Sequence, residues 1–228
     1  IVDRKTRFIW IDMIANKSQA LDSLRRYCQD VGYKPKHIHL DGAGEHLGRF
    51  ASYCRENGIR QSFSCPYASE QNAIVERRMR LLKNAGRAAL MESGLPPAFY
   101  GHALQHAALV ENRLPHPHLR HTTPMQLQHP DRRPQDLVVF GSAAYHRIVP
   151  EQAKGGVSDP LKIPGNLGFY VGDSRYGTGR LVYQPIDGSV LPRRDVVFDE
   201  HWRYTAPGAI PAGVCSQCVE TFVPTEST

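Results

Sequence analysis

Strand-like and helix-like segments alternate along the first half of the chain, and this alternation constrains the fold more than any other feature. Segments rich in β-branched and aromatic residues lie at 7–14, 37–41 and 59–65. Segments with apolar residues at helical spacing lie at 18–32, 47–58, 71–93 and 96–114. Strands that alternate with helices predict a layered α/β core.

The pattern changes in the second half. Residues 115–134 are rich in Pro, His and Arg, which is typical of an extended connection. Short strand candidates with Gly-rich turns follow at 136–149, 165–173, 179–190 and 193–200, and IDGS predicts a hairpin turn. We therefore expect a core at 1–118, truncated at its N-terminus, a linker at 119–136, a small all-β domain at 137–200 and a poorly ordered tail at 201–228.

Charge and cysteine content narrow the class of protein. The 228 residues carry a net charge of +6, which suits a polyanionic partner such as nucleic acid. No apolar run reaches the roughly 18 residues of a membrane span. Five cysteines without a secretory signal favour free thiols. Cys215 and Cys218 form a CxxC pair, but a zinc site needs two more ligands at suitable spacing, and no second pair lies nearby.

The helix predicted at 71–93 has an acid at the head of a basic stripe. At 100° per residue, Glu76, Arg80, Lys83 and Arg87 share one stripe, and Val75, Met79, Leu82 and Ala89 form a neighbouring apolar stripe that we expect to face a core. Such a cationic track could neutralise phosphates and align DNA beside a metal site. The alternative is a solvated basic face with a Glu76–Arg80 ion pair.

Three acids, Asp3, Asp41 and Glu76, lie where predicted elements begin or end. Carboxylates are the hard oxygen ligands that Mg²⁺ prefers, and two such ions about 4 Å apart can promote phosphodiester chemistry. A chain with 22 acids offers many triples, so spacing alone does not select this one. Asp12 and Glu45 are rival candidates.

Several motifs, taken in order, give these acids a context. VDRKTRFIW resembles the first motif of the integrases of copia-type (Ty1/copia) LTR retrotransposons; LDGAGEH and PYASEQNAIVER are similar to the second and third. Later segments resemble the parts of the Gag-Pol polyprotein that follow: NRLPH, TPMQL, VFGSAAY, GFYVG and SVLPRRDVVFDE. The resemblance extends over residues 1 to about 200.

The resemblance implies a ribonuclease-H-like mixed sheet with flanking helices, in which Asp3, Asp41 and Glu76 bind two Mg²⁺ or Mn²⁺ ions. It implies DNA as substrate, trimmed at its 3′ ends and then joined to target DNA. Arg80, Lys83 and Arg87 would hold phosphates. Gln71 and Asn72 would touch DNA near the metals, although Asn72 could equally cap the helix.

The same resemblance implies a homo-oligomer without membrane attachment, acting in the nucleus after a cytoplasmic particle stage. Protease and reverse transcriptase would lie elsewhere in the polyprotein, and a zinc module would precede residue 1. Gly42, Ala43, His46 and Ala73 depart from the family's usual residues. A catalytically decayed DNA-binding relic and a simple nuclease of the same fold are therefore the alternatives.

Overall fold

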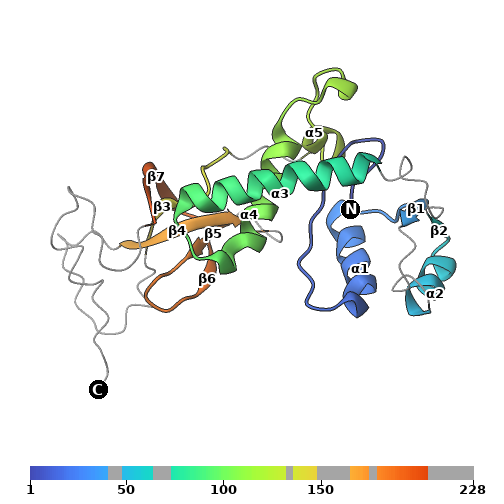
Figure 1. The fold of residues 1–228 in the computed structure, drawn as a ribbon, viewed down its shortest axis with the longest axis horizontal. Helices are drawn as coiled ribbons and strands as arrows, with labels where there is room; N and C mark the ends of the chain where they lie inside the picture. Colours follow the sequence, from blue (N-terminus) through green and yellow to red (C-terminus); the bar gives the residue numbers. More distant parts are fainter. Residues whose placement is uncertain (41–47, 64–72, 132–135, 148–164, 175–178, 205–228) are drawn as a thin grey trace. The chain divides into compact units, whose positions relative to one another are not determined.

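The computed structural model describes residues 1–40, 48–63, 73–131, 136–147, 165–174 and 179–204 (Figure 1). The chain forms two compact units. Unit 1 comprises residues 1–85 and 107–135, and unit 2 comprises residues 86–106 and 136–228. The predicted class, an α/β core followed by a small β domain, is confirmed. The described residues combine helices and strands in the first part of the chain and form an antiparallel sheet later.

Unit 1 begins with a turn rather than with the strand expected at 7–14. Its pairing within 1–14 is an isolated antiparallel bridge between Val2 and Ile9, with further backbone bonds from Asp3 N–H to Phe8 C=O and from Trp10 N–H to Ile1 C=O. The strand prediction was wrong for this part of the described chain, because the pairing is too short and irregular to form a regular strand. Apolar side chains here are nevertheless buried, namely Phe8, Ile9 and Trp10.

The remaining elements of unit 1 follow the predicted order. They are the 3₁₀ turn η1 (Lys17–Gln19), α1 (Ala20–Val31), β1 (His37–Leu40), α2 (Arg49–Glu56), β2 (Arg60–Phe63) and the first part of α3 (Ala73–Ser93). Gly32 ends α1 with φ 77°, the left-handed conformation that glycine adopts without steric cost. β1 and β2 pair in parallel, with His37 opposite Arg60. Leu21, Leu24 and Tyr27 of α1 pack on Phe50 and Cys54 of α2 in one core.

The short helix η5 (Pro117–Leu119) lies at the start of the segment predicted as a linker, and α5 (Pro124–Gln128) lies within it. Thr123 caps α5, since its side chain accepts the N–H of Gln126. Met125 of α5 packs against the α1–α2 core. The prediction of a linker at 119–136 therefore does not describe this segment, which belongs to unit 1.

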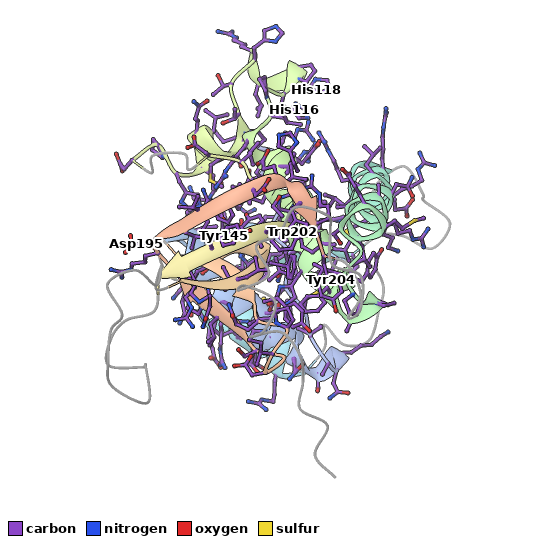
Figure 2. The ribbon with its side chains drawn as sticks, turned by 90° about the vertical axis from the view of Figure 1, so that its left-hand side faces the viewer. His116, His118, Tyr145, Asp195, Trp202 and Tyr204 are labelled. Carbon is purple, nitrogen blue, oxygen red and sulfur yellow. The ribbon has the colours of Figure 1, made fainter. Side chains whose placement is uncertain are left out.

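The described residues of unit 2 form five antiparallel strands in the order β6-β5-β4-β3-β7. These are β3 (Ser142–Arg147), β4 (Gly165–Asp173), β5 (Arg180–Tyr183), β6 (Val190–Arg193) and β7 (Val196–Arg203). The predicted hairpin joins β5 to β6, with Gly188 at φ 71° in its turn. Figure 2 shows Tyr145 of β3 beside Trp202 of β7, whose ring centroids are 6.3 Å apart.

Helical residues complete unit 2. The 3₁₀ turn η4 (Pro97–Phe99) leads into α4 (Tyr100–Arg113), and Leu95, Phe99 and Ala103 share a core with Phe140 and Phe169. The predicted boundary at residue 118 therefore differs from the structure, because residues 86–106 pack with the sheet. None of the described helices has the length and apolar composition that a membrane span requires.

Candidate nucleic-acid and metal site

Asp3 closes the tight turn at the start of unit 1. Its Oδ1 accepts the N–H of Lys5 at 2.9 Å, the N–H of Thr6 at 2.6 Å and the Thr6 hydroxyl at 2.9 Å. Its Oδ2 lies 3.4 Å from the Tyr33 hydroxyl. An aspartate that bonds the backbone two and three residues ahead stabilises a turn. This local role accounts for Oδ1, and Oδ2 is the oxygen that remains available to a cation.

Asp41 and the residues around it fall outside the part of the chain that the structure describes. β1 ends at Leu40, so Asp41 follows the strand as predicted in sequence, but its side chain is not placed. Glu45, Gln71 and Asn72 also lie outside the described residues. The rival candidate Asp12 is paired instead with Arg26, at 2.5 Å, which gives it a structural role.

Glu76 lies in the first turn of α3 and is exposed. A carboxylate at this position interacts favourably with the helix dipole. Within the described ranges, Glu76 makes no ion pair with Arg80, so the predicted alternative of a local pair is not formed there. As far as the described residues are concerned, the exposed carboxylate can therefore face a cation or solvent.

The cations of α3 follow Glu76 along an exposed face. Arg80, Lys83 and Arg87 are all exposed, as the stripe predicts. The neighbouring apolar stripe was predicted wrongly: Leu82 is 3% exposed, but Val75 and Met79 are 42% and 37% exposed. Side chains that line this face of the helix thus add apolar surface beside the cations.

Arg78 explains why the buried face of α3 differs from the prediction. Its guanidinium forms an ion pair with Glu111 of α4 and donates to Nε2 of His116. Burial above all, and then the positive charge of Arg78, lower the pKa of His116 and keep its ring neutral as an acceptor. Figure 2 shows His116 beside His118. A partnered arginine can therefore occupy the inner face, where Leu82 packs on Ile9 and Ala107.

Sequence reasoning missed this Arg78–Glu111–His116 cluster. Arg78 is four residues before Leu82 and shares its helix face, which relates it to the buried side of α3 but not to its partners Glu111 and His116. Without knowledge of which face is buried, however, one arginine among five basic residues could not be singled out. His106 has a packing role, since its Nε2 lies 2.9 Å from the Val138 carbonyl oxygen and its ring packs against Phe140.

The described donors fit a hard divalent cation in type but form no complete set. Glu76 and Oδ2 of Asp3 are oxygen donors of the kind that Mg²⁺ prefers. Among the described residues, no three His, Cys, Asp or Glu side chains gather closely enough to hold a metal ion. Asp41 is not among these described residues. Cys28 and Cys54, the cysteines placed in the structure, are free thiols as predicted.

Comparisons with known proteins bear on the motifs. No protein-family model matches the chain. It is 29% identical over 211 residues to the "Retrovirus-related Pol polyprotein from transposon TNT 1-94" of Nicotiana tabacum, covering 87% of this chain and 15% of that protein. It is 28% identical over 210 residues to the Pol polyprotein from transposon RE2 of Arabidopsis thaliana, covering 87% and 14%. The chain thus spans about one-seventh of the curated relatives it matches.

Solved structures also align with the chain. A simian T-cell lymphotropic virus intasome in complex with PP2A regulatory subunit B56 gamma aligns with 19% identity and a TM-score of 0.48, over 85% of this chain and 68% of that one. The HTLV-2 integrase catalytic core domain in complex with magnesium aligns with 22% identity and a TM-score of 0.47, over 56% and 81%. The curated relatives confirm the resemblance seen in the motifs: this chain is similar to a segment of retrovirus-related Pol polyproteins of plant transposons.

Proposed function

We propose that this chain is the integrase segment of a retrotransposon polyprotein, a divalent-metal-dependent polynucleotidyl transferase with a ribonuclease-H-like core. The observation that carries the proposal is the exposed face of α3, where Glu76, which has no ion pair among the described residues, is followed by Arg80, Lys83 and Arg87. The chain's similarity to Pol polyproteins over 87% of its length supports the assignment.

The residues divide into two roles. Glu76, Asp41 and Asp3 would hold Mg²⁺ or Mn²⁺, which in such sites supplies charge neutralisation and an activated attacking oxygen. Arg80, Lys83 and Arg87 hold phosphates of the bound DNA, with Gln71 and Asn72 near the reacting strand. In the joining step, a 3′-hydroxyl oxygen forms a bond to a target phosphorus, and the target's own 3′ oxygen leaves.

The proposal includes the setting of the reaction. The partners are the ends of the element DNA and the target DNA, and the integrase works as a homo-oligomer on chromosomal DNA in the nucleus. The Arg78–Glu111–His116 cluster contributes indirectly, because it fixes which face of α3 is buried and therefore which face carries Glu76.

Mn²⁺-dependent strand joining on a pre-branched DNA tests the proposal. Glu76→Gln removes the charge and keeps the shape, so we expect joining to fall by about 100-fold or more, the consequence of losing several kcal/mol of transition-state stabilisation. Glu92→Gln is the matched control on the same helix, since Glu92 is also exposed. Equal loss in both variants would contradict the assignment of Glu76.

A second candidate is a DNA-binding relic without chemistry. The turn-closing bonds of Asp3 favour it, because they give that acid a role without metal. A relic joins no DNA in any variant, yet its affinity for duplex DNA falls with salt. Replacing Lys83 by Gln would then reduce the slope of log K against log salt by about 1 while joining stays absent.

A further inference from the structure

A hollow of about 430 Å³ lies along α1 and the turn after it in unit 1, a size within the range of ligand sites. Its walls are Arg25, Cys28, Gln29, Gly32, Tyr33, Lys34 and Tyr53. A second hollow of about 260 Å³ is lined by Leu21, Arg25, Arg49, Ser52, Tyr53 and Glu56. Because the two hollows share Arg25 and Tyr53, they adjoin, and we call them together the α1–α2 trough.

The trough offers aromatic surface at a fixed position. Tyr33 is 43% exposed, yet its hydroxyl accepts a hydrogen bond from Nε2 of Gln128 at 3.1 Å. The exposed ring is therefore held at its far end and cannot swing freely. Tyr53 lies under the guanidinium of Arg25, 5.1 Å from the ring centroid. An aromatic ring held in place can stack a flat partner without losing much side-chain freedom.

The charges of the trough favour an anion. Arg25, Lys34 and Arg49 line it and are exposed, against a single acid among its walls, Glu56. Arg25 also pairs with Asp22, but both side chains are about half exposed, so solvent weakens that pair. Lys34 is oriented by Oδ1 of Asn57 at 2.6 Å.

An unpaired DNA strand uses both features together. Bases stack on aromatic rings while Lys and Arg follow the phosphates, and this combination is typical of grooves that bind single strands. An acidic peptide would satisfy the cations but would gain little from a fixed, exposed ring. The stripe on α3 differs, because its cations stand beside aliphatic side chains and have no described aromatic partner.

We propose that the α1–α2 trough binds single-stranded DNA, with a base stacked on Tyr33 and phosphates on Lys34 and Arg49. The choice of DNA rests on the proposed integrase function, whereas the trough itself rests on its shape, rings and charges. The α3 stripe then holds duplex phosphates, and the trough holds an unpaired strand.

Fluorescence anisotropy with a labelled 12-nucleotide oligothymidine and with a 12-base-pair duplex tests this division on the full chain. Tyr33→Leu keeps apolar bulk but loses the ring, so we expect binding of the single strand to weaken at least about fivefold, with duplex binding unchanged. Tyr33→Phe keeps the ring but loses the hydroxyl that holds it, so its binding of the single strand should lie between that of the parent and that of Tyr33→Leu. Lys83→Gln should show the reverse selectivity and weaken duplex binding.

Two results of the binding experiment would overturn the proposal. One is a Tyr33→Leu variant that melts like the parent and binds oligothymidine as well. The other is polyglutamate that competes with oligothymidine equally against the parent and Tyr33→Leu, because a purely electrostatic site does not need the ring. A variant with altered melting is replaced by Lys34→Gln with Arg49→Gln, which should weaken binding of the single strand selectively.

Photocrosslinking gives a readout that does not depend on joining. An oligothymidine carrying one 5-iododeoxyuridine should crosslink to the peptide that contains Tyr33 or Tyr53, in the parent and in Glu76→Gln alike. Adducts confined to α3 would contradict the trough. If Glu76→Gln joins as well as the parent while the trough peptides crosslink, the assignment of Glu76 fails and the trough stands.

Discussion

Different kinds of hydrogen bond stabilise each of the two units internally. In unit 2, five antiparallel strands bond backbone to backbone, and Ala143 on β3 faces Phe169 on one side and Asp199 on the other. In unit 1, regular strand pairing among the described residues is confined to four positions of β1 and β2. Side chains bridge the rest: the Asn112 amide accepts the Ile9 N–H at 2.8 Å and donates to the Ile9 carbonyl at 2.7 Å.

The difference bears on where function can be placed. A backbone ladder tolerates many side chains, so unit 2 can keep its fold while its surface changes. Unit 1 depends on particular side chains, such as the Trp10 indole that donates to Asp30 at 2.7 Å. All three proposed metal ligands belong to the chain segment of unit 1, so mutations there must be tested for folding before they are interpreted as chemistry.

The largest expected effect on stability tests whether the backbone hydrogen bonds of the unit 2 sheet are enough to keep it stable when a buried ion pair is removed. Arg180 and Asp173 form an ion pair at 2.6 Å with both side chains 12% exposed, and the guanidinium also lies over Tyr170. Arg180→Met removes the cation beside the buried Asp173 carboxylate and leaves it the hydrogen bond from the Tyr170 hydroxyl, which should cost about 3 kcal/mol of unfolding free energy. Urea unfolding measures the loss.

Asp22→Asn is the matched control for Arg180→Met. The Asp22–Arg25 pair has exposed side chains, at 57% and 47%, and should contribute close to nothing. Hydrogen exchange should show the loss in Arg180→Met within β3, β4 and β5. Loss of protection in α1 instead would contradict the assignment of this ion pair to the sheet of unit 2.

The next effect tests the reliance of unit 1 on side chains. Asn112 is 3% exposed, and Asn112→Ala leaves both backbone groups of Ile9 without a partner. Each unsatisfied buried group costs about 1–3 kcal/mol, and we expect about 2 kcal/mol in total after partial solvation. Asn84→Ala, at an exposed position of α3, is the control. Thermal melting with near-ultraviolet circular dichroism of Trp10 measures the effect, and a difference below about 0.5 kcal/mol would contradict it.

Local signals in the sequence predicted elements better than they predicted contacts. The helix that ends at Gly32 and the Asp-Gly turn between β5 and β6 were predicted, because each depends on nearby residues alone. The packing of 86–106 against the sheet and the burial of Arg78 depend on partners far along the chain. Neither Glu111 nor His116 stands at helical spacing from Arg78, so no sequence period could have indicated the cluster.

The candidate site shows the same limit. Exposure of Glu76, Arg80, Lys83 and Arg87 follows from one helical stripe and was predicted. The strand expected at 7–14 was not found, because the consecutive residues Phe8, Ile9 and Trp10 are all buried while the backbone there forms only an isolated bridge. The metal set of Asp3, Asp41 and Glu76 stays a prediction, because it requires contacts between distant segments.

A smaller effect is the pH dependence of stability that arises from buried histidines in both units. Burial lowers the pKa of His102 and His146 in unit 2 and of His116 in unit 1. The folded protein therefore favours the neutral rings, and the unfolded chain binds protons first as pH falls. Stability is fully present above the ordinary histidine pKa of about 6.5 and declines below it. Urea titrations between pH 8 and pH 5 should show this decline, and His146→Gln should reduce it; a stability that rises toward pH 5 would contradict the sign.

The smallest expected change in stability decides the role of Asp3. Asp3→Asn keeps an Oδ1 that can accept from Lys5 and Thr6, so the turn should persist and unfolding free energy should change by less than about 1 kcal/mol. The substitution therefore separates the turn from the charge. Asp3→Ala, which removes both, should destabilise the turn further. If Asp3→Asn folds but loses Mn²⁺-dependent joining, the carboxylate acts as a metal ligand through Oδ2, the oxygen that the turn leaves available. If joining persists, Asp3 serves the turn, and unit 1 uses its side chains there for structure, as it does at Asn112.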